Sequence, residues 1–371
     1  MIEFIFISLF CLLLLCYSAI LIYFRKGLSE LKKPDSAKKL SVSVIVSAHN
    51  EEKTLLRLLS SLKSQSYPDE LTEIILVDDR SDDQTLKLMD HFAQQKNNTT
   101  ILKIEHTLPD VSPKKRAIRE AIETAQNDII ITTDADAVPG KNWIKSIVAY
   151  YTDNTGMVLG YAPYMTDPPF DTVFHKILSL EYFVMGSVTA ATAGLGFPVT
   201  CNGANLSYKR KLFNEIGGFG DSIKWLSGDD DLLMHRIKQK SSAEIKFAAA
   251  ECAAVYNDPP QNFSSFIRQR IRFSSKHIAY PLKVKLFLSV IYLFYLFLAG
   301  LLVTVFLIPS LLPLLLAAFC IKITAELQFL IPAKKILENR NLLLYYPLSV
   351  IPHIFYMIIF PVLGLIMPKK W

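Results

Sequence analysis

The sequence predicts an α/β domain with a mostly parallel, Rossmann-like sheet and helices on both faces, flanked by transmembrane helices. Two patterns support this fold class. From residue 41 onward, short β-branched runs alternate with segments of helical periodicity, which is typical of a parallel sheet covered by helices. Both ends of the chain are long apolar runs. The 371 residues are 51% hydrophobic and only 20% charged, which is more apolar than an ordinary soluble enzyme.

We therefore expect three regions along the chain. Residues 1–26 form a membrane anchor, residues 41–280 form a cytoplasmic domain with interfacial helices, and residues 281–371 form a C-terminal membrane region. The net charge of +6 comes mostly from basic residues that flank the apolar runs. Because no basic patch is interleaved with aromatic residues, nucleic-acid binding is not expected.

The first apolar run predicts a retained anchor. Residues 4–24 carry no charge and are long enough to cross a bilayer at ~1.5 Å per residue. They lack the small-residue cleavage site of a signal peptide. By the positive-inside rule, the basic residues that follow place the next domain in the cytoplasm and the N-terminus outside. These residues are Arg25, Lys26, Lys32, Lys33, Lys38 and Lys39.

Four strands are expected in the central domain, and a weaker pattern suggests a fifth. The strands are residues 42–47, 73–78, 100–104 and 129–133, with the weaker pattern at 157–161. Helical periodicity follows each of the first two strands and precedes the fourth. Asn50 lies where it can cap the helix after the first strand, with Glu51 in the first turn of that helix.

The last third of the chain is nearly all apolar. Residues 286–308 and 314–330 are expected to cross the membrane as a pair. In the second of them, Lys322 and Glu326 are four positions apart and can pair, so a structural or headgroup role is favoured over a transport site. Residues 343–367 either cross again or form a re-entrant hairpin, and Lys369 and Lys370 favour the hairpin.

Two more segments are expected to lie in the membrane interface. Residues 170–196 have helical periodicity and are interpreted as a helix beside an acceptor entrance, with an ordinary core helix as the alternative. Residues 263–276 suggest a second amphipathic helix. Its basic residues are predicted to lie near lipid headgroups, and these are Arg268, Arg270, Arg272 and Lys276.

Acidic residues follow the predicted strands, at the edge where parallel sheets display their ligands. They are Glu51, Asp78, Asp79, Asp134 and Asp136. The first strand–helix turn has no glycine-rich phosphate loop. A site lined by carboxylates repels bare phosphates and accepts a diphosphate only through a divalent cation, and Mg²⁺ needs only one or two protein carboxylates. The pattern therefore favours a metal-bridged nucleotide diphosphate, with a solvated acidic turn as the alternative.

Eight short motifs occur in order between residues 44 and 273: VIVSAHNEE (44–52), VDDRSDDQT (77–85), KKRAI (114–118), TDAD (133–136), NGANLSYKR (202–210), GGF (217–219), GDDDLL (228–233) and QRIRF (269–273). Together they resemble the motifs of membrane-integrated family 2 glycosyltransferases with the GT-A fold. The resemblance covers about residues 41 to 275. Each motif alone is weak, but their order and spacing are specific.

The resemblance implies roles for the matching residues around a donor nucleotide. It places Ser47, His49 and Asp79 along the base with Glu51 and Lys114 nearby, Asp134 on the ribose side, Asp136 on the metal, and Gln269 and Arg272 over the diphosphate.

The resemblance also implies a catalytic base. Asp230 matches this residue, and Asp229 takes the place of its usual neighbouring glutamate. The alternative interpretation is that the three acids from Asp229 to Asp231 only cap the following helix. Phe273 departs from the tryptophan of the family motif, which puts processive polymer synthesis in doubt.

The sequence thus predicts an inverting hexosyltransferase in the cytoplasmic membrane that depends on Mg²⁺ or Mn²⁺. It would move a sugar from a nucleotide-diphosphate donor, expected to be UDP-linked, to a lipid or membrane-associated glycan acceptor. The alternatives are a processive polysaccharide synthase, a non-catalytic sugar-nucleotide sensor and, third, a transporter. The scattered cysteines at positions 11, 16, 201, 252 and 320 are expected to be reduced, small apolar fillers.

Overall fold

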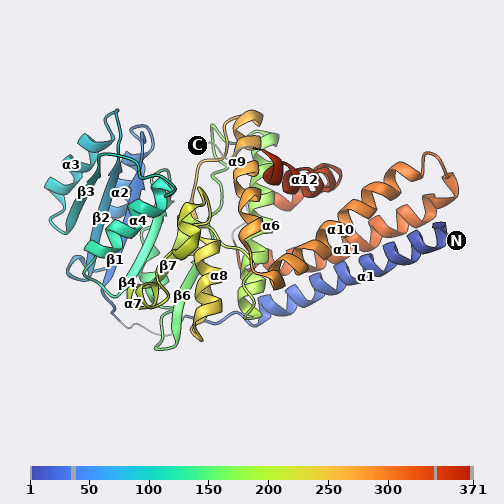
Figure 1. The fold of residues 1–371 in the computed structure, drawn as a ribbon, viewed down its shortest axis with the longest axis horizontal. Coiled ribbons are helices and arrows are strands. Elements are labelled where there is room, and N and C mark those ends of the chain that lie inside the picture. Colours follow the sequence, from blue (N-terminus) through green and yellow to red (C-terminus); the bar gives the residue numbers. More distant parts are fainter. Residues whose placement is uncertain (1, 35–38, 338–340, 368–371) are drawn as a thin grey trace.

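The computed structural model describes residues 2–34, 39–337 and 341–367. An α/β domain lies at one end and a bundle of long helices at the other (Figure 1). Of the basic residues used above, Lys38, Lys369 and Lys370 lie outside the described residues.

The predicted α/β class is confirmed by the sheet. Its strands are β1 (Val42–Ala48), β2 (Thr72–Asp79), β3 (Thr99–Ile104), β4 (Ile129–Asp134), β6 (Thr155–Gly160), β7 (Leu206–Lys209) and β8 (Glu244–Ala248). Within the described ranges they form one sheet of order β3-β2-β1-β4-β7-β6-β8. The four predicted strands are its parallel half. β7 was not predicted, and it runs antiparallel to both β4 and β6.

Helices cover both faces of the sheet. They are α2 (Leu55–Lys63), α3 (Thr85–Gln95), α4 (Pro113–Thr124), α5 (Trp143–Val148), α7 (Arg210–Glu215) and α8 (Asp231–Lys240). Val44 and Val46 of β1 pack with α2, α3 and α5, whereas Ile45 packs in the core that contains α4, α7 and α8. Because β1 is buried on both faces, its run of apolar residues is almost continuous.

The predicted cap of α2 was wrong. α2 begins at Leu55, and Thr54 rather than Asn50 precedes it. Asn50 instead has a left-handed backbone, φ 57°, and its side-chain oxygen accepts from the backbone N–H of Asp82, 3.0 Å away. This contact joins the turn after β1 to the turn after β2.

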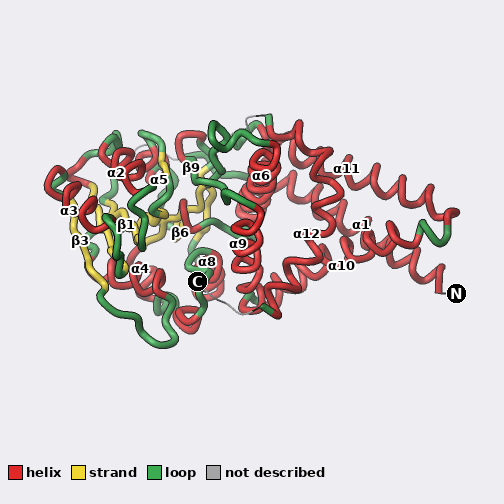
Figure 2. The backbone as a smooth tube through the Cα atoms, turned by 90° about the horizontal axis from the view of Figure 1, so that it is seen from above, coloured by secondary structure: helices red, strands yellow, loops and turns green. Residues whose placement is uncertain are grey.

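A second helical part extends away from the sheet. It contains α1 (Ile2–Ser29), α10 (Leu282–Thr304), α11 (Leu312–Lys334) and α12 (Tyr346–Ile366). In Figures 1 and 2, α1, α10 and α11 run side by side away from the domain. Among the described residues, five helices are long and apolar enough to span a membrane: these four and α6 (Val173–Gly194). Such helices indicate membrane association.

The predicted Lys322–Glu326 pair is present and lies inside this bundle. The two charged groups are 2.8 Å apart, and Lys322 is 1% exposed. Tyr17 of α1 donates to the Glu326 carboxylate at 2.5 Å, and Tyr295 of α10 lies 3.2 Å from it. These contacts cross from α11 to α1 and α10. The pair therefore has the structural role rather than a place at the headgroups.

α6 and α9 (Phe263–Ser275) run side by side between the sheet and the bundle, across the direction of α1 (Figure 1). The crossing of α1 and α6 is close, because a Cβ on Gly27 would lie 2.1 Å from the carbonyl oxygen of Ala191. A Cβ on Gly194 would lie 2.0 Å from the carbonyl oxygen of Gly27. Only glycine fits at these two positions.

The predicted location of two basic residues near lipid headgroups was wrong. Arg270 is 1% exposed and pairs with Glu181 of α6 at 3.1 Å, and α9 also packs on α12, so this side of the helix is covered by protein. Lys276 is 6% exposed and pairs with acidic residues of the domain. Helical periodicity shows that a face is amphipathic, but it does not show which element covers the polar side.

Asn205 holds the centre of the domain together. Its Nδ2 donates to the carbonyl oxygens of Tyr161 and Ala253, at 2.8 and 2.7 Å, and its Oδ1 accepts from Trp143 Nε1 at 3.0 Å. A Cβ on Gly160 would lie 2.2 Å from this side chain, so the strand next to it needs glycine there.

We predict that Asn205→Leu lowers the melting temperature on the order of 5 °C or more. The substitution leaves buried polar groups without partners, each at ~1–3 kcal/mol. Thermal unfolding of the detergent-solubilised protein measures this. Asn97→Leu, at an exposed position in the turn before β3, is the control and should change stability by less than ~0.5 kcal/mol. Equal melting temperatures for wild type and Asn205→Leu would contradict the prediction.

Candidate active site

The carboxyl ends of β1, β2 and β4 bring the predicted donor residues to one edge. Ser47 is in register with Asp134 of the neighbouring strand β4. His49 Nδ1 lies 2.6 Å from the carbonyl oxygen of Asp79. The Asp79 carboxylate pairs with Arg80, whose backbone is left-handed at φ 60°. A left-handed backbone is uncommon for residues other than glycine, and both Asn50 and Arg80 adopt it in the turns after the neighbouring strands β1 and β2.

Lys114 joins this edge to the three consecutive acids from Asp229 to Asp231, which we call the acidic triplet. Its Nζ lies 2.7 Å from Asp134 Oδ1 and 2.9 Å from Asp229 Oδ2. Burial alone lowers the pKa of Lys114, but the two carboxylates outweigh it and hold this pKa above its usual value. Lys114 therefore stays charged. Gly203 fits here because a Cβ at this position would lie 2.9 Å from Asp229 Oδ2.

Lys115, the next residue, fixes the loop that leads to the triplet. Its Nζ donates to the carbonyl oxygens of Ser222, Trp225 and Ser227, at 2.6, 3.1 and 3.0 Å. Burial lowers the pKa of Lys115 to about 8. One helix, α4, thus positions both the donor edge and the loop before Gly228.

Asp136 lies on the turn after β4 among other acids. Burial, followed by the negative charges of Asp134, Glu51 and Asp258, raises the pKa of Asp136 to about 7. Glu51 is also affected, since burial raises its pKa as well. Oxygen donors with excess negative charge are the ligands that Mg²⁺ and Mn²⁺ prefer.

The residues present fit a cation that is completed by its substrate. In the part of the chain that the structure describes, no group of three or more His, Cys, Asp or Glu side chains forms a metal site. One or two carboxylates are nevertheless sufficient for a cation that also binds water and the phosphates of a substrate. Asp136 would hold such a cation, which would supply positive charge to a diphosphate.

Asp258 is a neighbour of Asp136 that the sequence did not reveal. The two short strands β5 (Val138–Pro139) and β9 (Val255–Tyr256) pair and bring the two segments together. Arg57 of α2 donates two hydrogen bonds to the Asp258 carboxylate, from Nη1 to Oδ1 at 3.0 Å and from Nη2 to Oδ2 at 2.6 Å. Two-residue strands leave no periodic signal, so only the fold shows this proximity.

The acidic triplet divides into three environments. Asp229 faces Lys114. Asp230 precedes α8 and accepts from the backbone N–H of Asp231 at 2.7 Å and from Lys276 Nζ at 3.0 Å. Asp231 is fully buried, 2.8 Å from Lys276 and hydrogen-bonded to the hydroxyl of Tyr280. Asp230 does cap the helix, and at 15% side-chain exposure it also stays accessible.

Lys276, which the sequence predicted to lie near lipid headgroups, instead belongs to this site. It follows α9, and it pairs with both Asp230 and Asp231. Burial alone lowers the pKa of Lys276, but these two carboxylates outweigh it and raise the pKa above the usual value. The lysine therefore balances the charge of the triplet.

Gln269 and Arg272 lie on α9. Gln269 Oε1 accepts from the Tyr164 hydroxyl at 2.9 Å, and the Arg272 guanidinium lies 5.3 Å from the ring centroid of Phe273. Lys276 Nζ is 5.8 Å from the same ring. Phe273, which replaces the tryptophan of the motif, thus has cations around its ring. The place of Gln269 and Arg272 over a diphosphate stays a prediction.

The sequence model described as "Glycosyl transferase family 2" matches residues 43–217. "Probable glycosyltransferase YdaM" of Bacillus subtilis is 25% identical over 255 residues, which are 67% of this chain and 56% of the relative. "Beta-monoglucosyldiacylglycerol synthase" of Synechocystis sp. is 30% identical over 114 residues, 31% of this chain and 23% of the relative. The chain thus spans about half, or less, of the length of these curated relatives.

A solved structure resembles nearly the whole chain. It is the mannosyltransferase PcManGT from Pyrobaculum calidifontis, in complex with GDP-Man and Mn²⁺. The TM-score is 0.63 at 20% sequence identity, over 89% of this chain and 97% of the other. At this identity, the likeness shows a shared fold.

Proposed function

Because this chain carries a family 2 glycosyltransferase domain with the GT-A fold, we propose that it moves a hexose from a nucleotide-diphosphate donor to a lipid or membrane-associated glycan, with inversion. The observation that carries the proposal is the position of Lys114. It contacts Asp134 on the donor edge and Asp229 in the triplet, so donor and base share one site.

In this mechanism the chain binds, orients and accepts a proton. Ser47, His49 and Asp79 line the nucleotide at the ends of β1 and β2. Asp230 takes the proton of the acceptor hydroxyl as that oxygen attacks the anomeric carbon. Arg272 neutralises charge that grows on the leaving diphosphate, beside Gln269. When bound, Mg²⁺ or Mn²⁺ supplies further positive charge to that diphosphate.

A single transfer is favoured over processive synthesis. The interior between α1, α10 and α11 is filled by Tyr17, Tyr295 and Glu326, which contact one another. This filling supports a role of the helices as an anchor rather than as a channel for a polymer. The donor is proposed to be UDP-linked, although the GDP-Man complex of PcManGT makes guanosine nucleotides a necessary comparison.

The proposal is tested with the purified full-length chain and a panel of UDP- and GDP-sugars, with and without Mn²⁺ or Mg²⁺. Release of nucleoside diphosphate from one donor, which depends on the cation, is the expected result. Product analysis in added membrane lipids then identifies the acceptor. A folded protein that binds a donor but neither hydrolyses nor transfers it would instead be a non-catalytic sensor.

We also propose a cytoplasmic site in a multi-pass protein of the cytoplasmic membrane. A cysteine introduced by Asn97→Cys, exposed in the turn before β3, should not react with an impermeant maleimide added to intact cells. Ser310→Cys, in the exposed turn between α10 and α11, should react. Both variants need Cys252→Ser and Cys320→Ser, because these native cysteines are exposed. Labelling at position 97 without lysis would overturn this topology.

A further inference from the structure

We propose that Lys276 is a positioning residue, which holds Oδ1 of Asp230 so that Oδ2 takes the proton of the acceptor hydroxyl. This inference rests on the proposed function, and it assigns an atom and a supporting residue to the base. In the step, the O–H bond of the acceptor breaks and its proton moves to Oδ2. The oxygen uses its electron pair to bond the anomeric carbon, and the bond from that carbon to the diphosphate breaks with its electrons on the diphosphate.

The two donors to the Asp230 carboxylate bind the same oxygen. Oδ1 accepts from the backbone N–H of Asp231 at 2.7 Å and from Lys276 Nζ at 3.0 Å, and these are the donors that the described chain supplies to this carboxylate. The backbone donor belongs to the adjacent residue and moves with Asp230, whereas the lysine comes from another segment. Lys276 is therefore the contact that fixes the orientation of the carboxylate, and Oδ2 is the oxygen left to accept a proton.

Lys276 is itself held in place by a second carboxylate. Its Nζ lies 2.8 Å from Asp231 Oδ2, an oxygen that also accepts from the Tyr280 hydroxyl. The lysine side chain is only 8% exposed, and its raised pKa keeps it charged. Hydrogen bonds between an ammonium and carboxylates are stronger than those between neutral groups. The lysine can therefore restrain Asp230 more strictly than a solvated side chain would.

The position of Lys276 links the base to the helix assigned to the diphosphate. Lys276 begins the 3₁₀ helix η5 (Lys276–Ala279), directly after α9, the helix that carries Gln269 and Arg272. The hydroxyl of Ser275 donates to the carbonyl oxygen of Arg272 at 2.9 Å, which ties the end of α9 together. The residue that orients the base and the residues proposed to contact the diphosphate thus come from one end of α9.

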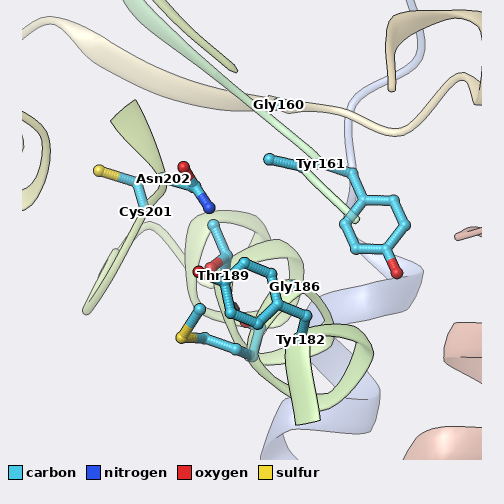
Figure 3. A pocket seen from close by; sticks show the side chains of 9 residues that line it. Gly160, Tyr161, Tyr182, Gly186, Thr189, Cys201 and Asn202 are labelled. Atoms are coloured by element: carbon cyan, nitrogen blue, oxygen red, sulfur yellow. Dashed lines mark hydrogen bonds between the residues drawn. The ribbon is translucent and has the colours of Figure 1, made fainter. Parts of the chain in front are cut away.

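Gly203 marks where the base meets the donor edge. A Cβ at this position would lie 2.9 Å from Asp229 Oδ2, 3.5 Å from Lys114 Nζ and 3.6 Å from the Cβ of Asp230. The segment before this glycine is packed against α6, because the space between Asn202 and that helix has a volume of about 20 Å³ (Figure 3). This is room for about one water and is too small for a sugar. The place for the acceptor is therefore near Gly203, where Lys114 and Asp230 meet.

The alternative is that Lys276 only balances the buried charge of Asp231. The two roles predict different losses when the lysine is replaced. Loss of charge balance lowers stability, because it leaves a buried carboxylate without its partner. Loss of positioning lowers kcat and leaves donor affinity unchanged, because a misplaced base affects the reaction rather than the binding of the donor.

The test compares two buried lysines in the full-length, detergent-solubilised chain. The assay follows nucleoside diphosphate release from the UDP- or GDP-sugar that the wild type cleaves fastest, with water as the acceptor. Lys276→Met should lower kcat by ~10–100-fold and leave the dissociation constant of that donor unchanged. Lys246→Met is the matched control, since its side chain is 9% exposed and contacts Tyr150 and Thr152 instead of the acidic triplet. It should lower the melting temperature and leave kcat unchanged.

A double variant separates positioning from charge balance. Lys276→Met combined with Asp231→Asn removes both buried charges, and the amide keeps an oxygen for the Tyr280 hydroxyl, so much of the stability should return. We expect kcat to stay low, because Asp230 still lacks its second donor. This variant also supplies the kcat if Lys276→Met alone does not fold. Recovery of kcat together with stability would show that the lysine only balances charge.

The activity of the wild type separates this inference from the proposed function. A folded wild type that released no nucleoside diphosphate from any donor would refute the proposed function and this inference with it. Release at the wild-type rate by folded Lys276→Met would refute the inference alone and leave Asp230 as the proposed base.

Discussion

Asp230→Asn should lower sugar transfer by ~10²–10⁴-fold while donor affinity changes little. The amide is nearly the same size as the carboxylate, but at neutral pH it cannot take up the proton of the hydroxyl that receives the sugar. It retains an oxygen for the N–H of Asp231 and for Lys276, so the start of α8 should persist. Initial transfer rates and donor dissociation constants, measured on one preparation, check the prediction.

Three comparison variants make the assignment specific. Arg272→Ala should weaken donor binding and transfer together, because the proposed role of Arg272 is to neutralise charge on the leaving diphosphate. Asp229→Asn should weaken the contact with Lys114 at the donor edge. Asp231→Asn should mainly lower stability, because Asp231 is fully buried against Lys276. Near wild-type transfer by Asp230→Asn, with Asp229→Asn inactive, would move the base to the neighbouring carboxylate.

Asp136→Asn should abolish the stimulation of donor binding by Mn²⁺ or Mg²⁺ with the fold intact. The substitution removes the charge that would hold the cation, and titration calorimetry with and without metal measures the loss. The variant should also stabilise the metal-free protein at pH 8, because it removes a charge that burial and neighbouring acids disfavour. Donor turnover by this variant in the presence of a chelator would contradict the metal bridge.

The pH dependence of this effect has a definite sign. The pKa of Asp136 is raised from 3.8 to about 7, so the folded protein holds this proton more tightly than the unfolded chain does. Stability from this group is fully present below pH ~4 and is lost as the pH rises through about 7. Melting temperatures in EDTA should therefore fall between pH 5 and 8 by less in Asp136→Asn than in wild type.

The parallel half of the fold could be predicted because its signals are local. β1, β2 and β4 each contain an apolar run of at least three residues, and polar residues of a motif follow directly after each run. β7 is different, since Leu206–Lys209 is only four residues long and inserts between β4 and β6 through contacts distant in sequence. A short strand of this kind acquires its identity from its neighbours.

The residues of the site also divide into those that a local sequence motif predicts and those that only distant contacts bring in. Lys114, Asp134 and Asp229 were each singled out by motif, and the structure brings all three together within hydrogen-bonding distance. Asp258 and Lys276 were not assigned to the site because each reaches it through a distant contact, the β5–β9 pairing in one case and the end of α9 in the other. An amphipathic pattern around Lys276 indicated lipid, whereas the polar side in fact meets α8.

The pairing of Lys276 with Asp230 has a geometric consequence. Lys276 lies in the short connection that leads from α9 into α10, so the carboxylate is tied at 3.0 Å to the base of a helix of the bundle. Under the proposed function, a base held at this point would act on acceptor hydroxyls at one depth relative to the helices. A sugar added to the acceptor would then present its new hydroxyl farther from Asp230, which would favour a single transfer.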